Sequence, residues 1–151
     1  MNTKLFEPSD LESTLKITEE FIINNLENDN YNENWLTQDF YERILLGKTE
    51  EKFDTIITRN NDIVLGFIIG APFSPIIYEI RQHYVAEGYR GRRIAKKQKE
   101  FLTQLAKDRG YRAIVSDVSK SNTASVRLNR SSHWLERELE EDYIRFYKIL
   151  K

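Results

Sequence analysis

The sequence predicts an α+β fold with a mixed, mainly antiparallel and twisted sheet of about seven strands flanked by about four helices. Short runs of β-branched and aromatic residues are separated by turn-rich segments, which is typical of strands. Longer segments carry apolar residues at helical spacing. Strands and helices are expected in the order β, α, α, β, β, β, α, β, α, β, β. Since the chain shows neither repeat nor linker, we expect a single domain over residues 1–151.

The first part of the chain is expected to contribute one short strand and two helices. These are a strand at 4–6 and helices at about 10–27 and 37–46. Ser9, followed three positions later by Glu12, has the form of a capping box and predicts the start of the first helix. The polar stretch 28–33 predicts a loop, and Gly47 is expected to end the second helix.

The middle of the chain predicts an antiparallel meander. Its strands are expected at 53–58, 63–69 and 76–85, separated by two turn-rich stretches. Side chains two positions apart in a regular strand share a face. We therefore expect one face of the third strand to present Glu79, Arg81, His83 and Val85, which would make Glu79 and His83 neighbours.

The last part of the chain predicts two helices and three further strands. The helices are expected at about 92–109 and 122–131, and the strands at 113–118, 134–139 and 143–150. Gly110 is expected to end the first of these helices. The last two strands would close the sheet as a hairpin.

The composition narrows the classes of protein. With 40% hydrophobic and 31% charged residues, the chain is expected to fold as a globular protein without a membrane partner. The absence of Cys removes thiolate metal sites and cysteine nucleophiles, and we expect no metal. The apolar run 63–70 is far shorter than the roughly 18 residues of a spanning helix. Residues 1–8 have no apolar signal-peptide core, so we expect a cytoplasmic location.

The charge is unevenly distributed along the chain. Residues 1–60 contain 13 acidic and 6 basic side chains, whereas residues 61–151 contain 11 acidic and 17 basic ones. One interpretation is two solvated faces. The other is a cationic substrate near the acidic part and an anionic ligand near the basic part.

An anion site is expected where the strand ending at Val85 turns into the following helix. Gly88 and Gly91 lie in this connection, and six of the ten residues 90–99 are basic. A helix N-terminus presents unpaired N–H groups to a phosphate, and nearby glycines allow close approach. A solvated helix face and a nucleic-acid interface are the alternatives.

Two segments resemble the acetyltransferases of the GNAT superfamily. The segment Val85–Ala95 resembles their strand, turn and helix, in which the pattern Arg/Gln-x-x-Gly-x-Gly/Ala cradles the coenzyme A pyrophosphate. Arg90 and Ala95 fill the outer positions, while Arg93 stands at the usual Gly. The segment 122–129 resembles their second cofactor segment. The resemblance implies that acetyl-CoA is bound by Val85, Arg90, Gly91, Arg92, Arg93, Ile94, Ala95, Asn122 and Ser125.

The resemblance also implies direct attack of an amine on the acetyl thioester. Glu79 or His83 would accept the proton, directly or through water, and the Val85 N–H would polarise the thioester. Asn129 stands where the family usually has a Tyr acid; it can donate a hydrogen bond but cannot titrate. As structural alternatives, Glu79 would form an ion pair with Arg81, and His83 would be a hydrogen-bonded sheet residue.

We therefore expect an N-acetyltransferase that acts on a primary amine of a small molecule, peptide or protein. A cationic acceptor is favoured because the first two helices of the family border the acceptor site and are acidic here. The alternatives are a non-catalytic acyl-CoA-binding module and a nucleic-acid-binding protein that uses residues 90–99. The sequence leaves a homodimer open.

Overall fold

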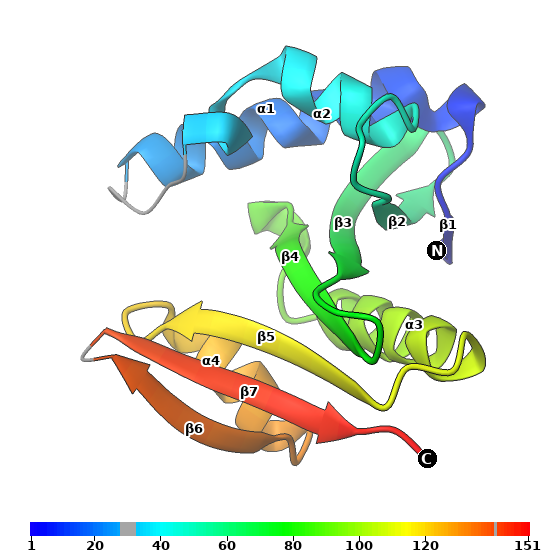
Figure 1. Ribbon diagram of the computed structural model, residues 1–151. Helices are drawn as coiled ribbons and strands as arrows, with labels where there is room; N and C mark the ends of the chain where they lie inside the picture. Colours follow the sequence, from blue (N-terminus) through cyan, green and yellow to red (C-terminus); the bar gives the residue numbers. More distant parts are fainter. Residues whose placement is uncertain (28–32, 141) are drawn as a thin grey trace.

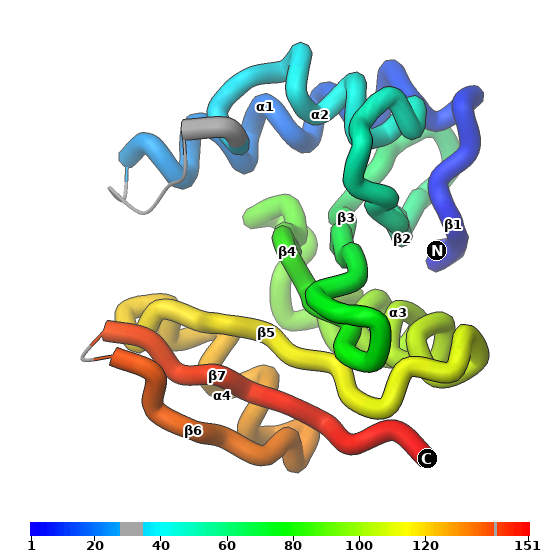
Figure 2. Tube along the Cα trace, viewed as in Figure 1, coloured from blue at the N-terminus to red at the C-terminus, as the bar shows by residue number. Residues whose placement is uncertain are grey.

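The protein forms a seven-stranded sheet with helices on both faces (Figures 1 and 2). A computed structural model describes residues 1–27, 33–140 and 142–151. The strands lie in the order β1-β2-β3-β4-β5-β7-β6, and all pairs are antiparallel except β4 with β5. The predicted α+β class and the predicted order of elements are both confirmed.

The helices and strands fall close to the predicted positions. The strands are β1 (Asn2–Leu5), β2 (Asp54–Asn60), β3 (Ile63–Pro72), β4 (Ile77–Val85), β5 (Ala113–Ser119), β6 (Leu135–Glu140) and β7 (Tyr143–Ile149). The helices are α1 (Leu11–Glu27), α2 (Gln38–Leu45), α3 (Ile94–Asp108) and α4 (Thr123–Ser131), with short 3-10 helices at Pro8–Asp10, Glu33–Leu36 and Glu87–Tyr89. Of the predicted loop 28–33, residues 28–32 lie outside the described part of the chain.

Among the described residues, the two largest of three apolar cores hold the helices to the sheet. On the face that we call the front, α1 and α2 pack on β2–β4 through an aromatic cluster that includes Phe21, Tyr41 and Phe67. On the back face, α3 and α4 pack through a second cluster that includes Leu102 and Phe146. Burying a side chain of this size contributes roughly 1.5–3 kcal/mol. The two cores therefore fix both faces of the central strands, and with them the elements around the site.

A buried tyrosine fixes β4 against its neighbours. A Cβ at Gly70 of β3 would meet the Tyr78 ring, so glycine leaves room for this ring. The Tyr78 hydroxyl donates to Asp54 Oδ2 over 2.6 Å, and Arg109 at the end of α3 donates to the same oxygen. This network joins β4, β2 and α3 at the end of β4 that is paired with β5.

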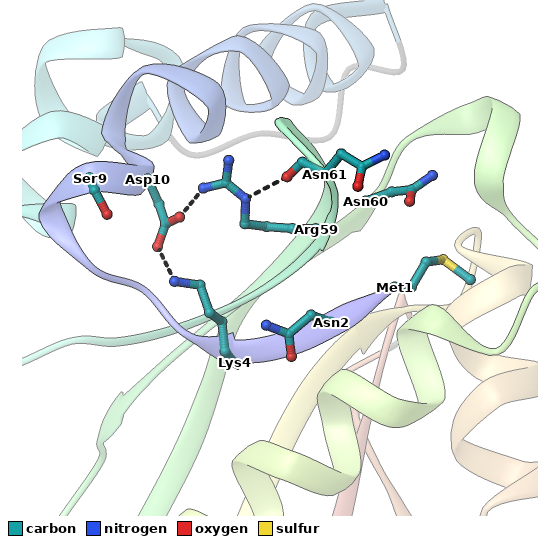
Figure 3. Close-up of a pocket in the computed structure, with 8 residues that line it drawn as sticks. All are labelled: Met1, Asn2, Lys4, Ser9, Asp10, Arg59, Asn60 and Asn61. Carbon is teal, nitrogen blue, oxygen red and sulfur yellow. Dashed lines mark hydrogen bonds and ion pairs between the residues drawn. The ribbon is translucent and has the colours of Figure 1, made fainter.

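The start of α1 differs from the predicted capping box. Asp10, which is 1% exposed, accepts a hydrogen bond from the Glu7 N–H over 2.9 Å and pairs with Lys4 of β1 and Arg59 of β2 (Figure 3). The predicted capping box of Ser9 and Glu12 is therefore wrong. The chain first makes a 3-10 turn over Pro8–Asp10, and the capping box is formed by Glu7 and Asp10 instead.

Two irregularities of β4 shape the middle of the sheet. Ile69 of β3 pairs with Gln82, but the next residue, Gly70, pairs with Ile80, which leaves Arg81 as a bulge. On its other side, β4 pairs with β5 only over Ile77–Glu79. Beyond Glu79 the two strands separate, as Figure 1 shows.

No helix in the described ranges is long and apolar enough to cross a membrane.

Candidate active site

The separation of β4 and β5 creates a cleft of about 560 Å³. Side chains of both faces of the sheet line it. The front contributes aromatic rings and a carboxylate, from Phe21, Trp35, Asp117 and Tyr143. The back contributes polar groups, from His83, Asn122 and Ser125. The cleft therefore offers two chemically different halves that meet between the strands.

The bulge at Arg81 places Glu79 and His83 on opposite faces. Glu79 pairs with Arg81, whose guanidinium lies 5.8 Å from the centroid of the Phe53 ring at the front core. His83 lies at the back, beside Gln98 and Lys99 of α3. The expectation that these two side chains are facial neighbours is therefore wrong, because one extra residue in the strand reverses the alternation beyond it.

Glu79 is a partly shielded carboxylate. The predicted ion pair with Arg81 is present, and Arg81 also pairs with Glu51. Burial raises the pKa of Glu79, and the nearby charge of Arg81 opposes this rise. A carboxylate of raised pKa is a stronger proton acceptor than an ordinary one.

His83 is an enclosed, neutral histidine. Its Nε2 atom is buried and has no hydrogen-bond partner within the described part of the chain. Burial, together with the charge of Lys99, lowers the pKa of His83 to about 4. At neutral pH the ring is therefore uncharged, with one nitrogen able to donate and the other able to accept a hydrogen bond.

The turn into α3 contains two residues in the left-handed conformation. Gly91 has φ +79° and would have open space around an added Cβ, and Arg93 has φ 63° just before the helix. The side chain of the N-cap residue, Arg93, makes no capping hydrogen bond within the described part of the chain, which leaves the first N–H groups of α3 available to a phosphate. The left-handed Arg93 also explains why α3 begins at Ile94 rather than at the predicted residue 92.

Of the remaining predicted groups, Asn122 and Ser125 line the same cleft, and Val85 is the last residue of β4. The Ala86 N–H donates to Leu65 of β3, and strand N–H groups alternate in direction, so the Val85 N–H points toward the gap beside β5. The Val85 carbonyl accepts a 3.1 Å hydrogen bond from Arg90 Nε. At the start of α4, Asn122 Oδ1 accepts from the Ser125 N–H over 3.2 Å. Asn122 is therefore the N-cap of α4.

The comparisons with known proteins identify the family. The model of the acetyltransferase (GNAT) family matches residues 21–133. The chain belongs to the GNAT acetyltransferase family. Among solved structures, an N-acetyltransferase from Staphylococcus aureus Mu50 is 26% identical, with TM-score 0.80 and coverage of 99% of this chain and 98% of that one. No curated protein sequence gives a significant match.

Two more distant structures share the fold. A ribosomal-protein-alanine N-acetyltransferase from Brucella melitensis is 22% identical, with TM-score 0.81 and coverage of 99% of this chain and all of that one. The PaiA N-acetyltransferase from Thermoplasma acidophilum, solved in complex with coenzyme A, is 12% identical, with TM-score 0.77 and 99% of both chains covered. The match to the acetyltransferase family model identifies this GNAT chain as an acyltransferase enzyme. No cluster of potential metal ligands occurs among its described residues.

This GNAT enzyme departs from the family pattern at Asn129. The side chain is 1% exposed, and its Nδ2 donates to the Ser125 carbonyl one turn earlier in α4. Its Oδ1 is buried and has no partner within the described residues. Asn129 thus braces α4 and leaves a hydrogen-bond acceptor unused.

Two buried polar residues of α3 escaped the sequence analysis. Gln98 and Lys99 are 0% and 4% exposed. The helical spacing could have identified Gln98, since it falls on the same buried stripe as Ile94 and Leu102. Lys99 is one of the six basic residues of 90–99 that the sequence predicts at an anion site or on a solvated helix face, whereas its Nζ lies 3.8 Å from the centroid of the Trp134 ring.

Proposed function

We propose that this GNAT enzyme transfers the acetyl group of acetyl-CoA to the primary amine of a small molecule or of a peptide or protein, by direct attack of the amine on the thioester. The observation that carries the proposal is the cleft between β4 and β5, lined from both faces of the sheet. The donor enters from the back and the acceptor from the front. The two reactants then meet where the strands separate.

The back half of the cleft fits acetyl-CoA. The uncapped N-terminus of α3 and the turn through Gly91 and Arg93 offer backbone N–H groups to the pyrophosphate. The Val85 N–H polarises the thioester carbonyl, and Asn122 and Ser125 border the path of the pantetheine chain. The unpartnered His83 Nε2 adds a hydrogen-bonding group on this side.

The front half of the cleft fits a cationic acceptor. The rings of Phe21, Trp35 and Tyr143 line it and can stabilise an ammonium group by cation–π contact. Asp117 lies among them, paired with Arg145 over 2.7 Å. Glu79, on the same face, accepts the surplus proton of the attacking amine directly or through a water molecule.

Nucleic acid is less well supported as a ligand of residues 90–99. Lys99 is buried, and Arg90 Nε is hydrogen bonded to the Val85 carbonyl. The Arg90 guanidinium also lies 5.3 Å from the centroid of the Tyr84 ring. The Arg92 guanidinium lies 5.2 Å from the centroid of the Tyr89 ring, so three of the six basic side chains are engaged within the protein.

The test is thiol release from acetyl-CoA with a panel of amines. The panel pairs lysine-rich with glutamate-rich peptides that have free N-termini, and adds small polyamines. We expect turnover, with the cationic acceptors used best. Acetyl-CoA binding without thiol release across the panel would contradict the proposal in favour of a non-catalytic module.

A further inference from the structure

Lys99 is a buried cation behind the cofactor half of the cleft. It is 4% exposed, and its Nζ faces the Trp134 ring rather than a carboxylate. Within the described residues Lys99 forms no ion pair. A buried ammonium without a counter-ion is costly, usually by several kcal/mol. An apolar side chain at this position would cost less folding free energy. We therefore infer that Lys99 has a functional role.

The surroundings of Lys99 contain unused hydrogen-bonding atoms. Buried atoms without partners occur at His83 of β4, Gln98 of α3 and Asn129 of α4, three elements that enclose the back of the site. The Asn129 carbonyl accepts a 3.1 Å hydrogen bond from the Trp134 N–H, which ties the ring beneath Lys99 to α4. The polar cluster of His83, Gln98 and Lys99 therefore lies between α3 and β4, and the Trp134 ring that Lys99 faces is joined to α4.

Among the described residues, the charged group that acts on Lys99 is another cation. His83 faces Lys99 from β4 and is neutral, and Lys148 of β7 repels the charge of Lys99. Burial, and then Lys148, lower the pKa of Lys99 to about 7. Near neutral pH the free protein therefore holds Lys99 in both its charged and its neutral form, and a new negative charge nearby would stabilise the charged form.

The transfer reaction creates such a charge. The amine nitrogen bonds to the acetyl carbon, the carbon–sulfur bond breaks, and its electron pair leaves on sulfur. The surplus proton of the amine goes to Glu79 or to solvent. Asn129 cannot supply a proton to the sulfur. A fixed positive charge in a dry site can stabilise the thiolate without proton transfer.

We propose that Lys99 is a positioning residue for the leaving group: its buried ammonium, behind His83, stabilises the thiolate of coenzyme A in the site where Asn129 provides no acid. This assignment rests on the proposed acetyl transfer. The charge of Lys99 acts through the electric field that it creates at the sulfur atom. Lys99 also acts by orienting the His83 ring.

The test compares Lys99→Met with Gln98→Leu. Both variants remove a buried polar group from α3, but only the first removes a charge. The primary readout is the pKa of the thiol of bound coenzyme A, followed by thiolate ultraviolet absorbance between pH 6 and 10. We expect wild type and Gln98→Leu to lower this pKa by about one unit or more relative to free coenzyme A, and Lys99→Met to abolish the shift.

Turnover gives an independent readout. Lys99→Met should lower kcat about 10- to 100-fold with the KM for acetyl-CoA within about twofold, because the charge acts only as the thiolate forms. Its Tm should equal or exceed that of wild type, since an unpaired buried charge is removed. Equal thiol pKa values in wild type and Lys99→Met would overturn the role of Lys99 without affecting the proposed acetyl transfer. A wild-type protein that does not bind coenzyme A would overturn the proposed function itself.

Discussion

Glu79 and His83 face opposite sides of the sheet although both belong to β4, because the bulge at Arg81 lies between them. This geometry divides the cleft. Glu79 lies on the face of the sheet that α1 and α2 cover, whereas His83 lines the cleft on the face that α3 covers. Under the proposed function, the two groups would therefore serve different reactants rather than compete for one role.

The first prediction concerns Glu79 as the proton acceptor. Glu79→Gln should lower kcat/KM about 10²-fold or more while leaving acetyl-CoA affinity unchanged, since the carboxylate lies on the acceptor side. Because burial raises the pKa of Glu79, the activity of the wild type should rise with pH as this carboxyl loses its proton. The pH–activity profile of Glu79→Gln should lack this rise. Glu51→Gln is the matched control: it removes the other ion pair of Arg81 and should retain activity within about threefold.

The second prediction concerns the charge of His83. Since its pKa is lowered to about 4, the ring should remain neutral from pH 5.5 to 8 in the free enzyme. Histidine ring signals in NMR spectra would be followed over this range, with His133→Gln used to assign them, because His133 is the second of 2 histidines. A His83 signal that titrates near pH 6.5 would contradict the enclosed geometry.

The third prediction concerns the left-handed turn. Arg93 has φ 63°, a conformation that costs an ordinary residue about 1–2 kcal/mol and glycine almost nothing. Arg93→Gly should therefore raise the unfolding free energy by about 1 kcal/mol, measured by urea denaturation. Arg92→Gly removes the same charge at a position without positive φ and should destabilise the protein instead. Equal effects of the two changes would contradict the strain.

The fourth prediction concerns Asp10. Burial alone would raise its pKa, but the hydrogen bonds from Lys4, the Glu7 N–H and Arg59 outweigh burial and lower it. A carboxyl of depressed pKa stabilises the folded state above its unfolded pKa, and this contribution is lost as pH falls toward the folded value. Asp10→Asn should therefore cost about 1–3 kcal/mol at pH 7 and less at pH 3. The control is the exposed Ser9→Ala, and a penalty independent of pH would count against the ionic network.

Local rules predicted most of the fold. Gly47 and Gly110 end α2 and α3 with φ of 69° and 87°, as expected of helix C-termini. The bulge at Arg81 and the separation of β4 from β5 could not be predicted from the sequence, because both depend on pairing between distant segments. The regular alternation assumed for β4 consequently misplaced Glu79 relative to His83.

The candidate site was predicted unevenly for a similar reason. The predicted anion turn is one continuous segment, so Gly91 and the approximate start of α3 could be located from the sequence, although α3 begins at Ile94 rather than at residue 92. The burial of Lys99 depends on Trp134, which lies beyond α4 in the sequence. A basic side chain in a lysine-rich helix gives no local sign that it faces a core.

The central claim is that acetyl-CoA binds in the back half of the cleft between β4 and β5. The most direct measurement is an NMR titration of the backbone amides with acetyl-CoA. We expect saturable binding, with the largest shifts at Val85, at residues 91–95 and at Asn122 and Ser125, and none at the distant pocket around Asp10 (Figure 3). No saturable shifts, or shifts confined to residues outside the cleft, would contradict the account.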